Sequence, residues 1–120
     1  MRLVVSRESV EGAVMLRIVG EIDSSNVGEF AEQLAAVMSQ NGDRGSGPFV
    51  IDLQGVTFFG SAGLNAVLAC HEKGTANGAS VRLVATQPEV LNPIQVTKLD
   101  SVLEIYPSVS EAIIGNSAKT

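Results

Sequence analysis

A serine hydroxyl among small residues is the most promising chemical group in this sequence. Ser61 follows Gly60 and precedes Ala62-Gly63, so little side-chain bulk surrounds its hydroxyl. The apolar run 49–53 before it is typical of a strand buried on both faces, and the pattern from Leu64 onward predicts a helix that begins near Ser61. On position alone, the plainer interpretation is that Ser61 caps this helix.

A phosphate on Ser61 would be compatible with such a position. The start of a helix has unpaired N–H groups and a partial positive charge, both of which favour an anion. The phosphate would add roughly −1.5 to −2 charges to the surface around it. If a partner covered that surface, leaving this charge unpaired could cost several kcal/mol, and each 1.4 kcal/mol is about a tenfold change in affinity.

Hydrolase chemistry is a poor match to the same serine. A nucleophile elbow has the pattern Gly-x-Ser-x-Gly, whereas here Gly60 is adjacent to Ser61. The single histidine, His71, lies ten residues further along the same predicted helix, which is about 15 Å at the helical rise. That distance is too long for a general base. We therefore expect a protein that is not an enzyme, with His71 at the surface or at the end of the helix.

We expect the other potentially reactive side chains to have structural roles. Asp52 has no acidic neighbour, and we interpret it as a polar residue at the end of a strand. Cys70, the single cysteine, is expected to be a small core residue. The sequence has neither a phosphate-binding P-loop nor a Cys/His set with metal-ligand spacing. No cofactor and no metal are therefore expected.

Five strands and four helices are predicted to position these residues. Residues 3–5 and 13–19 are predicted to form a hairpin around Glu11-Gly12, and further strands are expected at 49–53, 81–84 and 103–106. Apolar residues at helical spacing predict a helix over 27–41, with Ser25 or Asn26 as its cap and a pattern at Asn26 and Glu29 that resembles a capping box. Further helices are predicted over 61–78, from Pro88 onward, and over 108–114 with Ser108 as the cap.

This order of elements predicts the fold class. Two strands come first, and helices and strands alternate thereafter, which gives parallel neighbours joined by crossovers. We expect an α/β fold with one mixed sheet of about five strands, an opening hairpin and about four helices that partly cover the sheet. A single domain is predicted over 1–114, with a flexible loop at 42–48 and a flexible C-terminal tail at 115–120.

The central motif resembles the signature of the STAS domain, the sulphate-transporter and anti-sigma-factor antagonist family. The family pattern is Asp-Leu-x-Gly-Val-x-Phe, then Asp-Ser, a small residue, Gly and Leu. Residues 52–64 read Asp-Leu-Gln-Gly-Val-Thr-Phe-Phe-Gly-Ser-Ala-Gly-Leu. Residues 20–23, Gly-Glu-Ile-Asp, are similar to the family segment before its first helix, and 99–106 are similar to its C-terminal segment.

The resemblance implies an anti-sigma factor antagonist, a switch in bacterial stress response and transcription regulation. In stand-alone members, the unphosphorylated protein binds an anti-sigma factor that is also a serine kinase, and thereby releases the sigma factor. Phosphorylation of the motif serine, here Ser61, ends the binding, and a phosphatase that removes the phosphate is a second implied partner. The implied contact residues are Asp23, Ser24, Ser25, Thr57, Phe58, Phe59, Gly60, Ser61, Ala62 and Gly63.

One departure from the family pattern keeps a second function open. Gly60 stands where the family usually has Asp, so a carboxylate that could contact the kinase or orient the serine is missing. Thr57 is the nearest other hydroxyl in the motif and a weaker candidate acceptor. The alternative is a binding or scaffold module of the same fold that senses a nucleotide, a lipid or a partner sensory domain without phosphorylation.

Composition and charge restrict the classes of partner and the cellular compartment that we expect for this protein. The chain has 120 residues, a formal net charge of −5 and a pI near 4.7, a balance that does not favour nucleic-acid binding. Neither a signal-peptide pattern nor a run long enough to cross a bilayer is present in the sequence. We therefore expect a cytoplasmic protein that does not associate with membranes.

Overall fold

The structure is a computed structural model that describes residues 3–10, 13–41 and 48–115. Its five strands form one sheet in the order β1-β2-β3-β4-β5, in which β1 is antiparallel to β2 and the other neighbours are parallel. The strands are β1 (Val4–Val10), β2 (Ala13–Ile22), β3 (Phe49–Phe59), β4 (Val81–Val84) and β5 (Glu104–Tyr106). The helices are α1 (Val27–Asn41), α2 (Ser61–Ala76), α3 (Pro88–Val96) and α4 (Val109–Ile114), with a short 3-10 turn at Leu99–Ser101.

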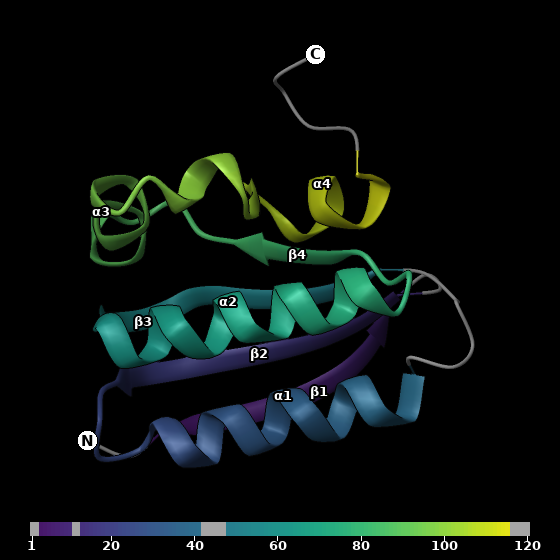
Figure 1. Ribbon diagram of the computed structural model, residues 1–120, viewed down its shortest axis with the longest axis horizontal. Helices are drawn as coiled ribbons and strands as arrows, with labels where there is room; N and C mark the ends of the chain where they lie inside the picture. The colour runs from purple at the N-terminus through teal and green to yellow at the C-terminus, as the bar shows by residue number, and fades with distance from the viewer. Residues whose placement is uncertain (1–2, 11–12, 42–47, 116–120) are drawn as a thin grey trace.

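The predicted fold class is confirmed, with its mixed sheet and antiparallel opening pair (Figure 1). The predicted cap of the last helix is also confirmed, because the Glu111 N–H donates to Ser108 Oγ at 3.2 Å. The predicted turn at 11–12, residues 42–47 of the predicted loop and residues 116–120 of the predicted tail lie outside the described residues. Gly115 is described, and it ends α4 in the left-handed conformation.

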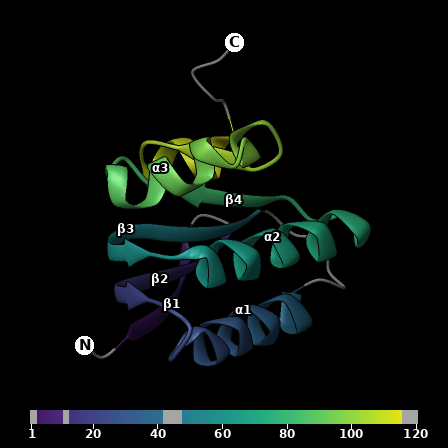
Figure 2. The same cartoon turned by 60° about the vertical axis from the view of Figure 1, so that its left-hand side comes forward.

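Helices cover the two faces of the sheet unequally. Along β3, Ile51 points to the face on which α1, α2 and α3 pack, and Val50 points to the opposite face, where α4 packs. The first face holds the main core, which includes Phe30 from α1, Val67 from α2 and Ile94 from α3. Figures 1 and 2 show α1 and α2 side by side on the sheet, with α3 and α4 at its other end.

Strand β3 is longer than predicted, and its extension leads to the candidate site. It runs to Phe59, so Asp52 lies within the strand and not at its end. Beyond Asp52, β3 no longer pairs with β4. The side-chain amide of Gln87 replaces the missing β4 partner: it donates to the Leu53 carbonyl at 2.7 Å and to the Val56 carbonyl at 2.8 Å. Backbone carbonyls that would otherwise lack partners are thereby satisfied.

Candidate functional site

Ser61 is the first residue of α2, at the edge of the sheet where β3 ends. Gly60 is the N-cap, so the interpretation of Ser61 as the cap is wrong. The first helical bond is from the Leu64 N–H to the Gly60 carbonyl, at 3.1 Å. The N–H groups of residues 61–63 therefore have no partner within the helix. Ser61 is exposed, and its hydroxyl makes no hydrogen bond to the described residues.

The connection from β2 to α1 lies against this helix start. The Gly60 N–H donates to the Ile22 carbonyl at 3.2 Å. This hydrogen bond joins the first connection, from β3 to α2, to the second connection, from β2 to α1. Asn26 holds the second connection in shape, since its side chain accepts from the Asp23 N–H at 3.0 Å and donates to the Glu21 carbonyl at 2.7 Å. Asn26 directly precedes α1, and its carbonyl accepts from the Phe30 N–H at 3.3 Å. Its side chain binds the loop instead of the Glu29 N–H, so the predicted capping-box bond from the Asn26 side chain is not formed.

Asp23 presents an ionised carboxylate beside Ser61. Its Oδ1 accepts from the Ser25 hydroxyl at 2.5 Å and from the Ser25 N–H at 2.8 Å. These bonds, the side-chain one foremost, lower the pKa of Asp23 below its ordinary value, because they favour the charged form. A fixed negative charge is therefore present at this edge at neutral pH.

The two connections enclose a shallow hollow of about 250 Å³. We call it the Ser61 hollow, and its lining residues are Asp23, Ser24, Phe58, Gly60, Ser61 and Ala62. All six are among the ten predicted contact residues, so the fold brings together residues from two segments about forty positions apart in the sequence. Phe58 is 50% exposed, which leaves a large apolar surface next to polar groups.

The other four predicted contact residues occupy different positions. Ser25 holds Asp23 as described above, and Thr57 is exposed beside Phe58, with its hydroxyl 3.5 Å from the Gly20 carbonyl. Phe59 and Gly63, however, lie in the interior. Buried residues cannot touch a partner on the folded surface, so their predicted role is corrected from contact to support.

Gly63 allows α2 to approach the end of the sheet. A Cβ atom at this position would lie 2.7 Å from Cγ2 of Ile22 and 3.1 Å from the ring of Phe59. Such distances are too short for carbon atoms in a packed interior. The glycine after Ser61 is therefore a packing requirement that brings the helix start against the β2–α1 connection.

Gly60 affects the hollow in a different way. Its φ of −83° is open to any residue, so its conformation does not require glycine. A Cβ atom would lie 3.1 Å from the ring of Phe58, which occupies the space beside it. Without a side chain at Gly60, no carboxylate caps α2, and the first N–H groups stay open to an external anion.

Sequence reasoning missed two residues that position the site. Asn26 shapes the connection that carries Asp23, and Gln87 holds the part of β3 that leads to Ser61. Asn26 gave a turn signal, which we assigned to helix capping. Gln87 gave no signal, because its partners are backbone carbonyls more than thirty residues away.

The other candidate reactive residues form no second site. Asp52 is buried and bound by Arg17, whose Nε lies 3.1 Å from Oδ2. Cys70 is in the core, as predicted. His71 lies within α2 rather than at its end, is partly buried, and its Nδ1 lacks a hydrogen-bond partner among the described residues. The described ranges contain no cluster of three or more side chains suited to a metal, and none of their helices is long and apolar enough to span a bilayer.

Comparison with known proteins identifies the family. Residues 5–112 match the STAS domain. The chain belongs to the STAS domain family. Among curated relatives of this STAS protein is RsfB of Mycobacterium tuberculosis, named an anti-sigma-F factor antagonist. It is 32% identical over 106 residues, which cover 87% of this chain and 81% of RsfB.

Solved structures agree with the fold of this STAS domain. An anti-sigma factor antagonist from Mycobacterium paratuberculosis superposes with a TM-score of 0.86 at 28% identity, covering 95% of this chain and 93% of the other. Unphosphorylated SpoIIAA, also an anti-sigma factor antagonist and a Bacillus protein, superposes with a TM-score of 0.71 over 92% of this chain and 93% of its own. At 19% identity, the second match supports the fold alone.

Proposed function

We propose that this STAS protein is a cytoplasmic anti-sigma factor antagonist. Its unphosphorylated form binds an anti-sigma factor with serine kinase activity through the Ser61 hollow, and the sigma factor is released. Phosphorylation of Ser61 ends the binding, and a phosphatase restores it. The protein acts by binding and is not itself an enzyme. The observation that carries the proposal is the exposed, unpartnered hydroxyl of Ser61 at the first position of α2.

The start of α2 favours a phosphate on Ser61 without unfolding. Three backbone N–H groups, of residues 61–63, lack helical partners there. Gly60 contributes no capping side chain that would compete for them. Helix N-termini stabilise nearby anions by about 0.3–1 kcal/mol when exposed. We therefore expect the phosphorylated domain to keep its fold.

The same phosphate would repel a partner from the surface. Asp23 already provides one negative charge in the Ser61 hollow, and the phosphate would add roughly two more. A partner that covers the hollow would have to desolvate or neutralise these charges together. That cost can reach several kcal/mol, which corresponds to an affinity loss of a hundredfold or more.

Phe58 is the expected anchor of the unphosphorylated contact. It is half exposed beside Asp23, Ser24 and Ser61. Aromatic side chains within a polar rim commonly contribute most of the binding energy of an interface. We therefore expect a partner with an apolar pocket for Phe58 and a basic group facing Asp23.

Intact-mass spectrometry tests the acceptor. Incubation with ATP and the cognate anti-sigma kinase should add one phosphoryl group to the wild type and none to Ser61→Ala. Thr57→Ala removes the weaker candidate acceptor, and it should still gain one phosphoryl group. Phosphorylation of Ser61→Ala would contradict the assignment, and an unmodified wild type would favour the alternative module that senses a nucleotide, a lipid or a partner domain.

Affinity measurements test the switch. Ser61→Glu should weaken anti-sigma factor binding at least about tenfold, whereas Ser61→Ala should bind like the wild type. Ser110→Glu is a matched control, because Ser110 is an exposed serine in the first turn of α4. Tight binding by Ser61→Glu would contradict the repulsion on which the proposed switch depends.

A further inference from the structure

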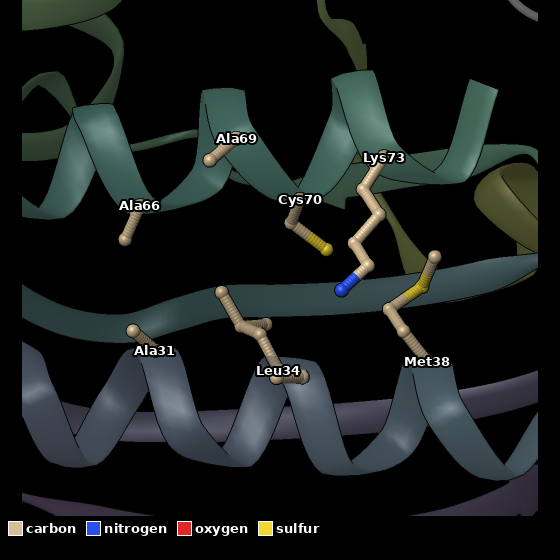
Figure 3. Close-up of a pocket in the computed structure, with 8 residues that line it drawn as sticks. Ala31, Leu34, Met38, Ala66, Ala69, Cys70 and Lys73 are labelled. Carbon is tan, nitrogen blue, oxygen red and sulfur yellow. The ribbon is translucent and has the colours of Figure 1, made fainter. Parts of the chain in front are cut away.

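A second depression lies between α1 and α2, away from Ser61 (Figure 3). We call it the α1–α2 groove, and its volume is about 150 Å³. It is lined by Ala31, Leu34, Ala35 and Met38 from α1 and by Ala66, Ala69, Cys70 and Lys73 from α2. The proposed switch at Ser61 does not use it.

The groove exists because alanines face each other across the two helices. Larger side chains at these positions would interdigitate and fill the space between neighbouring helices. Here Ala31 and Ala35 face Ala66 and Ala69 instead, so a slot stays open above the core residues. Of the four alanines, Ala66 is partly buried and the others are exposed.

The lining is apolar except at one end. Burial raises the pKa of the Cys70 thiol to about 11, so the thiol is uncharged at neutral pH and adds to the apolar surface. Figure 3 shows the Lys73 side chain reaching over the groove toward α1, with its ammonium group near Cys70 and Met38. Lys73 forms no ion pair with the described residues. An apolar slot thus ends at an unpaired cation.

We propose that the α1–α2 groove binds an amphiphilic carboxylate of medium chain length, with its hydrocarbon between the alanines and its carboxylate paired with Lys73. An engineered apolar cavity of about 150 Å³ holds benzene, so the groove has room for roughly six carbons. A carboxylate can pair with the exposed Lys73 ammonium, whereas a neutral hydrocarbon gains nothing from that charge. A fatty acid such as octanoate has both features.

The dimensions favour a small molecule over a protein helix. A helix with its side chains is about 10–12 Å wide, and a slot of about 150 Å³ could accept only one of its side chains. A hydrocarbon chain can lie along the slot for its whole length. The proposal is independent of the proposed function, because the groove follows the sides of the helices and Ser61 is the first residue of α2, outside the groove.

Titration with carboxylates, followed by amide chemical shifts, tests the groove. Octanoate should cause saturable shifts in α1 residues 31–38 and α2 residues 66–73. Affinity should rise about fourfold for each methylene from butanoate to octanoate until the groove is filled. Octanoate should also slow the reaction of Cys70 with a thiol reagent, a clear readout because the chain has no other cysteine. Ser61→Ala should bind octanoate like the wild type.

Two variants test the two halves of the ligand. Ala66→Leu should abolish octanoate binding, because the added carbons occupy the slot; Ala35→Leu on the opposite helix serves if Ala66→Leu does not fold. Lys73→Gln should weaken octanoate binding by up to about fivefold, because Lys73 is exposed and an exposed ion pair contributes little more than that. Lys98→Gln, at an exposed lysine outside the groove, should change nothing.

Four results would overturn the proposal. They are the absence of saturable shifts with octanoate, undiminished binding by a folded alanine-to-leucine variant, undiminished binding by Lys73→Gln, and equally tight binding of octylammonium, which has the same chain and the opposite charge. Shifts at the groove caused by a protein partner but not by octanoate would also count against a small ligand.

Discussion

Phe58 and Phe59 are neighbours in the sequence, but the two faces of the sheet give them opposite environments. Phe59 points into the core beneath α1 and α2 and is 2% exposed, while Phe58 is 50% exposed in the Ser61 hollow. The face covered by three helices can bury large side chains completely. At the end of β3, the Ser61 hollow leaves the Phe58 ring and the Asp23 carboxylate within reach of a partner. We therefore expect stability to depend mainly on the covered face and recognition on the Ser61 hollow.

The largest expected effect is on the covered face. Phe59→Ala should lower the free energy of unfolding by about 3–5 kcal/mol, because it leaves a cavity in a packed core. Phe58→Ala should lower it by less than about 1 kcal/mol, since half of that ring is already in water. Urea denaturation measures both. Equal destabilisation by the two variants would contradict the expected difference between the buried Phe59 and the half-exposed Phe58.

Phe58→Ala should have a small effect on stability but a large effect on partner binding. Phe58→Ala should weaken the anti-sigma factor complex about tenfold or more, as expected for an aromatic anchor, while leaving the fold intact. Isothermal titration with the unphosphorylated protein measures this loss. The matched control is Val96→Ala, another exposed apolar residue, outside the Ser61 hollow. Unchanged affinity of Phe58→Ala would mean that the Ser61 hollow is not the contact surface.

A smaller effect compares two carboxylates that share Arg17 on the less covered face. Asp52 is buried and also accepts from the Gln54 N–H at 3.0 Å, whereas Glu8 is about half exposed and lies 3.4 Å from Arg17 Nη1. Asp52→Asn should cost about 1–2 kcal/mol of unfolding free energy, and Glu8→Gln less than about 0.5 kcal/mol. A larger loss from Glu8→Gln would show that burial does not decide the strength of these pairs.

The smallest expected effect concerns pH and Asp23. Because its pKa is lowered in the folded state, the Asp23 carboxylate favours the fold at pH above the pKa of the unfolded chain, and this contribution is lost as pH falls through the folded pKa. Ser25→Ala should raise the pKa of Asp23 toward its ordinary value, because the hydroxyl bond is the main cause of the shift. Carboxyl NMR titration measures it. Ser24→Ala should leave the pKa unchanged, and a similar rise in both variants would contradict the assigned cause.

Local patterns were sufficient to predict most of the fold. The apolar spacing of α1, the cap at Ser108 and the order of strands and helices are properties of short segments, so the sequence could predict them. The end of β3 could not be predicted from a short segment. Its extension to Phe59 depends on pairing with β2 and on Gln87 after the pairing with β4 stops.

The sequence by itself determined the family and the strand-to-helix turn at Ser61, because these follow from a contiguous motif and local periodicity. Only the tertiary structure decided that Phe58 is exposed and Phe59 buried, that Asp23 shares a hollow with Ser61, and that alanines of α1 and α2 leave a groove beside Lys73. The physical reason is that exposure and cavities depend on which elements cover a face, and those elements come from distant parts of the chain.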